Sequence, residues 1–134
     1  MTTYSLSLPQ VVVNDKHISS VDISPVDLLK NYHHPEAGAI VLFSGEVRTD
    51  SNKEVLYLDY EVHEALAEKM IHAILMEAST KWKLKMALCM HRSGKVDVSG
   101  AAVVVITASR HRKEAYDANQ YIIHRVKHEA PIWK

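Results

Sequence analysis

The last third of the chain places a β-branched strand directly before a long amphipathic helix. Residues 103–107 read Val-Val-Val-Ile-Thr, a run typical of a buried strand. After a short turn, a helical pattern runs to Ala130, where Pro131 disfavours helical geometry in the residue before it. The apolar stripe of the helix is made by Ala115, Ala118, Ile122 and Val126, with Asn119 and Ile123 beside it. The pattern therefore predicts a buried strand followed by one helix that ends at residue 130.

The first turn of this helix carries an unusual charge. Residues 110–113 read Arg-His-Arg-Lys, four groups that can be cationic, at a helix end where the backbone dipoles already place partial positive charge. A chain built only for stability would carry Asp or Glu there. The arrangement is better explained by an anion that docks at this turn, held by free backbone N–H groups together with His111 and Arg112.

A second candidate position, Lys127, lies far along the same helix. The face that it shares is made by Tyr116, Gln120, Ile123 and Lys127. At about 1.5 Å per residue, Lys127 lies roughly 24 Å from His111 along a straight helix, which is too far for one small ligand. Two arrangements remain open: an elongated site along this face, or a dimer in which the neighbouring subunit supplies His111 and Arg112.

The rest of the chain alternates strand and helix patterns. Strands are predicted at 4–13 as an edge, at 38–48, at 54–62 antiparallel to the strand before it, and at 84–90 with one buried face. Helices are predicted from Pro25, capped by Ser24, to near Tyr32, and over 64–82. Residues 49–53 are expected to form an exposed loop, and 95–100 a polar connection. Gly45, near the end of the strand before the loop, suggests a bulge or a close backbone approach. We expect one α+β domain, residues 1–134, with a mostly antiparallel sheet.

Several cationic side chains follow strand ends. Arg48 ends its strand just before a loop, and His111 and Arg112 follow theirs. If both strand ends lie on one edge of a sheet, these residues meet and form a cationic pocket with Lys127 and Lys134. A lysine among other cations should have a lowered pKa, which suits a nucleophile or a general acid or base. The alternative is that each of these residues is an ordinary solvated surface group.

Composition narrows the class of protein. The 134 residues carry zero net charge with histidine neutral, so no overall field recruits nucleic acid or an anionic membrane. One cysteine excludes an intramolecular disulfide and fits a reducing compartment. The N-terminus lacks the pattern of a signal peptide, and no run approaches the ~20 apolar residues of a membrane span. We expect a cytoplasmic protein.

Metal and cofactor chemistry find little support. His124 and His128 are one helical turn apart, but Arg-Val-Lys lies between them in place of the Glu of a zinc-protease helix. Cys89 lies in mid-strand without a context that would lower its pKa, so it is interpreted as a small core residue. The sequence therefore predicts neither a metal site nor a cofactor.

Four motifs together resemble a known family. They are residues 38–48 (GAIVLFSGEVR), His91-Arg92-x-Gly94, Ser109-x-His111-Arg112, and residues 130–134 (APIWK). In order and spacing they resemble the large, catalytic subunit of molybdopterin synthase, over roughly residues 36–134. The resemblance implies a hammerhead-type α+β fold and a homodimer that binds one small ubiquitin-like sulfur-carrier subunit per chain, giving a heterotetramer. It also implies sulfur transfer from the carrier's C-terminal thiocarboxylate to cyclic pyranopterin monophosphate, which forms the dithiolene of molybdopterin.

The resemblance assigns roles to individual residues. His111 and Arg112 match the family's substrate-binding pair. Lys127 matches the lysine most closely tied to catalysis, and Lys134 matches a second active-site lysine. The strand end that lines the family's pocket corresponds to Glu46, Val47 and Arg48. Both substrates are anions, as the charge at residues 110–113 requires, and the sulfur arrives on the partner, so no catalytic cysteine is needed.

Two features depart from the family pattern. Its members usually continue past the Trp-Lys pair with a further polar segment, whereas this sequence ends at Lys134. Glu46 stands where a basic or neutral residue is common. Two alternatives to the sulfur-transferring enzyme follow: a non-catalytic homologue that keeps the partner-binding surface but has an incomplete active site, and a phosphate-ligand binder unrelated to the family.

Overall fold

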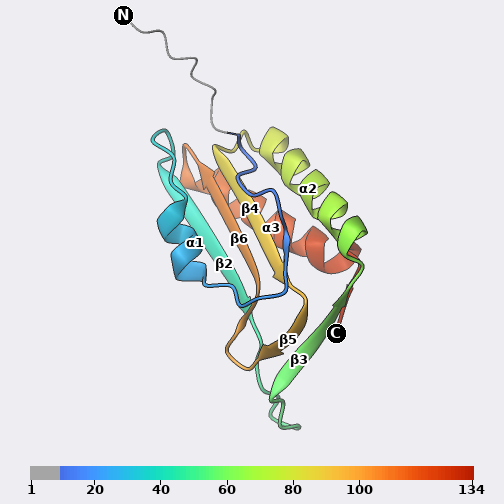
Figure 1. The fold of residues 1–134 in the computed structure, drawn as a ribbon. Coiled ribbons are helices and arrows are strands. Elements are labelled where there is room, and N and C mark those ends of the chain that lie inside the picture. Colours follow the sequence, from blue (N-terminus) through green and yellow to red (C-terminus); the bar gives the residue numbers. More distant parts are fainter. Residues whose placement is uncertain (1–9) are drawn as a thin grey trace, which may run out of the picture.

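The structure is a computed structural model that describes residues 10–134 (Figure 1). Its elements, in chain order, are β1 (Ile18–Ser19), α1 (Pro25–Asn31), β2 (Ala39–Glu46), β3 (Tyr57–Val62), α2 (Glu64–Lys81), β4 (Met86–Arg92), β5 (Gly94–Asp97), β6 (Ala101–Ser109), α3 (Arg112–Glu129) and β7 (Ile132–Trp133). The three helices match the predicted ones to within a residue or two at each end. Ser24 caps α1 by accepting a hydrogen bond from the backbone N–H of Asp27, as its position before Pro25 predicts.

The strands form two sheets. The larger has the order β1-β4-β6-β2, in which β6 pairs antiparallel with β2 and β4, and β1 pairs parallel with β4. The smaller has the order β5-β3-β7, with both pairs antiparallel. All nine residues of β6 are buried because this strand is central in the larger sheet. The α+β class with a mostly antiparallel sheet is therefore confirmed.

Helices cover both faces of the larger sheet, as Figure 1 shows. The face toward α2 and α3 packs Ala87, Cys89, Val103 and Val105 against the two helices. The opposite face packs Met86, Leu88, Val104 and Ile106 against partly buried side chains of α1 and the N-terminal segment. Both faces of β4 are thus buried, which corrects the expectation of a single buried face; alternation in the sequence cannot reveal the apolar cover that α1 and residues 11–23 supply.

Asn119 is the polar residue at the centre of the contact between α3 and the sheet. It is buried, and its side-chain amide nitrogen donates to the backbone carbonyls of Val41 on β2 (3.1 Å) and Val105 on β6 (3.0 Å), and approaches the hydroxyl of Thr107 (3.3 Å). The Thr107 hydroxyl in turn donates to the carbonyl of Ala115 (2.7 Å). The helix is therefore joined to two strands by directional bonds as well as by apolar contact.

Side-chain hydrogen bonds tie the N-terminal segment to α2 and β4. The carboxylate of Glu68 accepts from the backbone N–H groups of His17 and Ile18 at 2.8–3.0 Å. Asn14 and the imidazole of His17 both contact the carbonyl of Cys89. The predicted N-terminal edge strand falls partly outside the described residues, and within them Val12 forms an isolated parallel bridge to Ala87.

The smaller sheet departs from the predictions. β3 pairs with β5 and β7, so it is not the antiparallel neighbour of the strand before it. Residues 95–97 of the expected polar connection belong to β5. The reason lies at the end of β2, where the register shifts between Gly45 and Glu46 and the chain leaves the larger sheet. The bulge marked by Gly45 is confirmed, and the loop after it carries β3 away from β2.

Candidate functional site

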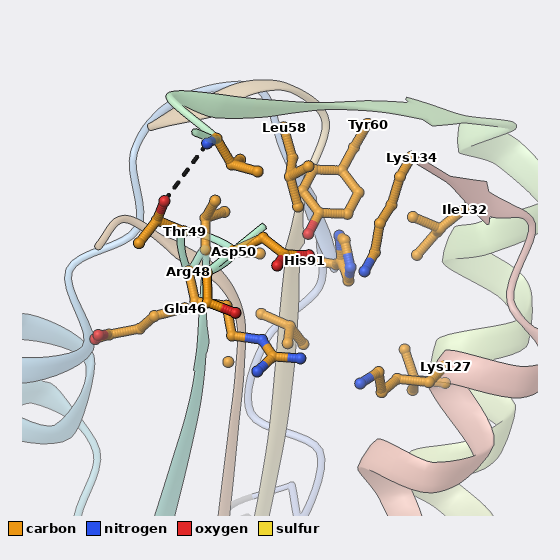
Figure 2. A pocket seen from close by; sticks show the side chains of 17 residues that line it. Glu46, Arg48, Thr49, Asp50, Leu58, Tyr60, His91, Lys127, Ile132 and Lys134 are labelled. Atoms are coloured by element: carbon orange, nitrogen blue, oxygen red, sulfur yellow. Dashed lines mark hydrogen bonds between the residues drawn. The ribbon is translucent and has the colours of Figure 1, made fainter. Parts of the chain in front are cut away.

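A pocket of about 680 Å³ opens where the two sheets meet the last turns of α3 (Figure 2). Its basic side chains are Arg48 from the end of β2, Lys127 from α3 and Lys134 from the residue after β7. Tyr60 and His91 contribute from β3 and β4. Three of the five cationic residues predicted to meet are thus gathered by elements far apart in the sequence.

The bulge in β2 sets the position of Arg48. A Cβ at Gly45 would lie 2.7 Å from the Cγ1 of Val103, so the bulged backbone passes β6 too closely for a side chain. Val47 beyond it is buried, donates to the carbonyl of Gly100 (3.0 Å) and accepts from the N–H of Ser99 (2.7 Å). These bonds hold the chain just before Arg48 and occupy both polar backbone groups of Val47.

Two short connections place the lysines. Val126 is buried against the core, so Lys127 beside it is held at the pocket wall on the last full turn of α3. Pro131 ends the helix, and its carbonyl accepts from the N–H of His63 (3.1 Å). Ile132 then pairs with Val62, so Lys134 is tied to the smaller sheet at the edge of the pocket. Figure 2 shows the two lysine side chains entering from different elements.

Glu46 does not place its carboxylate among these cations. In Figure 2 its side chain points away from Lys127 and Lys134. The carboxylate lies within 3.5 Å of the Ser44 hydroxyl, and the residue also borders a second depression, one lined by residues 22–25 and 95–101. Its charge therefore faces the outer side of the β2 bulge, away from the cationic wall.

Tyr60 and His91 are pocket residues that the sequence analysis did not assign to the site. Their rings meet edge to face with centroids 5.1 Å apart, and both residues are buried. Burial raises the pKa of Tyr60 and lowers the pKa of His91, since it disfavours the charged form of each group. The His91-Arg92-x-Gly94 motif was visible in the sequence, but the pairing of β3 with β5 that brings Tyr60 to His91 was not.

Arg92 supports this wall from behind. Its guanidinium is buried and donates to the carboxylate of Asp22 (2.7 Å) and to the carbonyl of Lys95 (3.0 Å), with a longer bond to Ser20. These contacts join the segment after β1 to the turn between β4 and β5. The motif therefore contributes one residue to the pocket and one to its scaffold.

His111 and Arg112 lie at the other end of α3, so the expectation that they share a sheet edge with Arg48 is wrong. β2 and β6 are antiparallel: Ala39 pairs with Ser109, and Glu46 pairs with Ala101. The end of β2 therefore lies beside the start of β6, while His111 follows the end of β6. Seven strand residues separate the two positions, about 23 Å at ~3.3 Å per residue.

The elongated groove along α3 is likewise absent from this pocket. From α3 the lining includes Val126 and Lys127 but none of Tyr116, Gln120 and Ile123. Ile123 packs against the core, whereas Tyr116 is mostly exposed. Of the two arrangements that the helix spacing left open, a groove within one chain is not formed by the described residues.

The described residues offer no reactive thiol, no metal site and no membrane-spanning helix. Cys89 is fully buried, and burial raises the pKa of its thiol to about 12, so it is a core residue as predicted. Within residues 10–134, no three His, Cys, Asp or Glu side chains are grouped so that they could hold a metal ion. Over the same residues, no helix combines the length and apolar character needed to cross a membrane.

The fold and the pocket define an α+β protein with a pocket lined by three cationic side chains, those of Arg48, Lys127 and Lys134. The chain matches the family described as MoaE protein over residues 18–129, and it belongs to this family. It is 42% identical over 118 residues to the molybdopterin synthase catalytic subunit of Bacillus subtilis, a match that covers 87% of this chain and 75% of that protein. Its function is that of a molybdopterin synthase catalytic subunit.

Solved structures agree with this assignment. The crystal structure of molybdopterin synthase from Staphylococcus aureus superposes with a TM-score of 0.83 at 34% identity, covering 90% of this chain and 88% of that one. A complex of subunits 1 and 2 of molybdopterin-converting factor from Helicobacter pylori has a TM-score of 0.76 at 24% identity, covering 92% and 82%. At this lower identity the second likeness concerns the fold.

Proposed function

We propose that the chain transfers sulfur from the C-terminal thiocarboxylate of a small ubiquitin-like carrier protein to cyclic pyranopterin monophosphate and so forms the dithiolene of molybdopterin. One observation carries the proposal: a chain of zero net charge gathers Arg48, Lys127 and Lys134 in a single pocket. A phosphorylated pterin and a thiocarboxylate are both anions, and a partly enclosed site strengthens their attraction to fixed cations.

The roles divide among the basic residues. Lys127 is the catalytic lysine and Lys134 the second, because both enter the pocket, one from α3 and one from the end of β7, across from Arg48. Arg48 binds substrate as a permanent cation. Glu46 and Val47 form the strand end that borders the substrate. The backbone of Val47 is not free to bond the substrate, since its N–H and carbonyl are already bonded to Gly100 and Ser99.

His111 and Arg112 complete the site of a second copy. They are exposed, no side chain caps the N-terminus of α3, and they lie about 22–24 Å from Lys127 along the helix at ~1.5 Å per residue. A homodimer that sets this turn against the neighbouring pocket brings all five cationic residues around one substrate. With one carrier per chain, the assembly is a heterotetramer.

The carrier reaches the pocket by an extended C-terminal tail. The relation to a two-subunit molybdopterin-converting factor supports such a partner. The buried thiol of Cys89 supports it further, because a chain with no accessible cysteine must receive its sulfur from another molecule. A single unpaired cysteine also fits a cytoplasmic setting.

Turnover tests the proposal directly. The purified chain is mixed with a carrier protein bearing a C-terminal glycine thiocarboxylate and with cyclic pyranopterin monophosphate, and the dithiolene product is measured. We expect product in proportion to the thiocarboxylate consumed. Carrier binding without any product would instead identify a non-catalytic homologue, and absence of both would remove the proposed partner and reaction.

A further inference from the structure

We propose that His91 is the general base that activates the water molecule which releases the carrier protein after sulfur transfer. The inference rests on the proposed function and adds a catalytic residue to it. His91 lies on β4 at the wall of the cationic pocket, is 8% exposed, and faces the same space as Lys127 and Lys134 (Figure 2).

The hydrogen bond of the imidazole fixes its tautomer. The Nδ1 atom of His91 lies 2.7 Å from the backbone carbonyl oxygen of Arg92. A carbonyl can only accept, so Nδ1 carries the proton and donates it. In the neutral ring, Nε2 is then an unprotonated acceptor. Within residues 10–134, no side chain or backbone group forms a hydrogen bond with this Nε2 atom.

Burial keeps the ring neutral. It lowers the pKa of His91, although the bond to the Arg92 carbonyl acts in the opposite direction. The charged residues that line the pocket with the ring are Glu46, Arg48, Asp50, Lys127 and Lys134. The phenol of Tyr60 packs on the ring from β3, and Arg92 is next in the chain. A neutral imidazole among these cations is an available base near pH 7.

The other candidate bases of the pocket are less suitable. Glu46 directs its carboxylate away from the lysines. Asp50 lies in an exposed loop, where its carboxylate accepts from the N–H of Asn52 (2.9 Å). Burial raises the pKa of Tyr60, so its phenol stays protonated. His91 is the one histidine among the pocket-lining residues that the structure describes.

The reaction requires such a base once per sulfur. When the thiocarboxylate sulfur bonds to the pterin, the carrier remains attached through an acyl–sulfur bond. The water oxygen attacks the acyl carbon while Nε2 takes one of its protons. The carbon–sulfur bond then breaks, and its electron pair leaves on sulfur. The imidazolium returns its proton to this thiolate, and the new carboxylic acid loses the remaining proton to solvent. Overall, the acyl–sulfur bond and one water become a carboxylate, a thiol and one released proton, and no oxidant is needed.

Two substitutions of His91 distinguish a proton-accepting role from a purely structural one. His91→Asn retains an amide donor near Nδ1, which can still bond the Arg92 carbonyl, and removes Nε2. His91→Gln places an amide oxygen or nitrogen near Nε2 that can hydrogen-bond but cannot accept a proton at neutral pH. His124→Asn, on an exposed turn of α3, is the matched control.

Single-turnover reactions with carrier thiocarboxylate and cyclic pyranopterin monophosphate are quenched and read by intact-mass spectrometry. We expect His91→Asn to form the carrier–pterin adduct at the wild-type rate and to release it about 10²–10⁴-fold more slowly. His91→Gln should be as slow, and His124→Asn should match wild type. In ¹⁸O-labelled water, the carrier released by the wild-type enzyme should gain one labelled oxygen.

The pH profile of the wild-type enzyme provides a test that needs no folded variant. Release should slow as the pH falls through the pKa of His91, and His91→Asn should lack this limb. Wild-type release rates in His91→Asn, restored release in His91→Gln, or unlabelled carrier would each overturn the role of His91. If the wild-type chain forms neither adduct nor product, the proposed function itself fails, and the role of His91 falls with it.

Discussion

The two ends of α3 carry similar charges in opposite surroundings. At the N-terminal end, His111 and Arg112 are exposed, against the dipole of their own helix, and outside the pocket. At the C-terminal end, Lys127 sits where the dipole favours a cation and beside a pocket closed by the smaller sheet. The C-terminal charges are thus explained within one chain, whereas those at the N-terminus require a ligand or a second copy.

Removing the cation at the enclosed end should have the largest effect. Lys127→Ala should lower the rate of sulfur transfer by at least about 10²-fold while carrier binding stays nearly intact, because the carrier's globular surface supplies most of its affinity. Lys127→Arg should not restore it, since guanidinium remains protonated. Single-turnover assays measure both, with Lys69→Ala on the exposed face of α2 as the control. Nearly full activity of Lys127→Arg would reduce Lys127 to an electrostatic anchor.

Removing the cation at the open end should weaken binding. Arg112→Ala loses a charge-assisted hydrogen bond worth about 1.5–3 kcal/mol, so calorimetry should find pterin affinity lowered roughly ten- to a hundredfold. The fold should remain stable, since this cation opposes the helix dipole. Lys113→Ala is the matched control, because Lys113 in the same turn is paired with Asp117 (2.8 Å). Unchanged affinity for Arg112→Ala would remove this end of α3 from the site.

Mixed dimers of Lys127→Ala and Arg112→Ala test whether the two ends of α3 belong to the same site. If a second copy supplies His111 and Arg112, a mixed dimer of Lys127→Ala and Arg112→Ala contains one site with both defects and one intact site. Co-refolded variants should then recover roughly a quarter of wild-type activity, as random pairing into two-fold dimers requires. Activity no higher than that of the separate variants would instead place both groups in the site of a single chain.

Substitution of two glycines, one near each end of α3, compares how much each region contributes to the free energy of unfolding. A Cβ at Gly38 would lie 2.4 Å from the backbone carbonyl oxygen of Arg110, just before α3 begins. At Gly45, beside the pocket, the obstacle is a side-chain methyl of Val103 at 2.7 Å. Because a backbone atom yields less readily than a side chain, Gly38→Ala should lower the free energy of unfolding more, by about 1–3 kcal/mol. Urea denaturation measures both, and a larger loss for Gly45→Ala would contradict this ranking.

Lowering the pH should have the smallest effect on the free energy of unfolding, and it should act through His17, beside the pocket residue His91. Burial lowers the pKa of His17, whose carbonyl accepts from the N–H of His91. The unfolded chain binds this proton near pH 6.5 and the folded chain only at lower pH. The free energy of unfolding should therefore be constant above pH 6.5 and fall as the pH falls below it. Denaturation at several pH values should show a shallower decline for His17→Asn, and His91 should account for another part of it. An unchanged slope in this variant would exclude His17 as a cause.

Local patterns predicted most elements but not how they meet. The spacing of Ala115, Ala118, Ile122 and Val126 fixes both the existence and the buried face of α3, and all four are buried. The pairing of β2 with β6 is a non-local choice, and the wrong assumption about its direction placed Arg48 beside His111. The sequence does not indicate the smaller sheet, because β7 has two residues and β5 has four, too few for an alternating pattern.

The candidate site divides in the same way. Lys127, Lys134 and Arg48 were predicted from charge and from family resemblance, since their residue types are visible in the sequence. The sequence also shows His91, but not its burial or the carbonyl that fixes its tautomer. The burial depends on the pairing of β3 with β5, which brings Tyr60 onto the ring, and the tautomer depends on the carbonyl of Arg92.

The hydrogen bonds of Asn119 set the rotation of α3 about its own axis. Apolar contact alone allows a helix to rotate slightly about its axis. An amide that is hydrogen-bonded to both β2 and β6 holds the helix in one orientation. Slippage by a single residue would rotate the helix by about 100° and carry Lys127 out of line with Lys134. The direction in which Lys127 points is thus determined about two helical turns away from it, by a side chain that does not line the pocket.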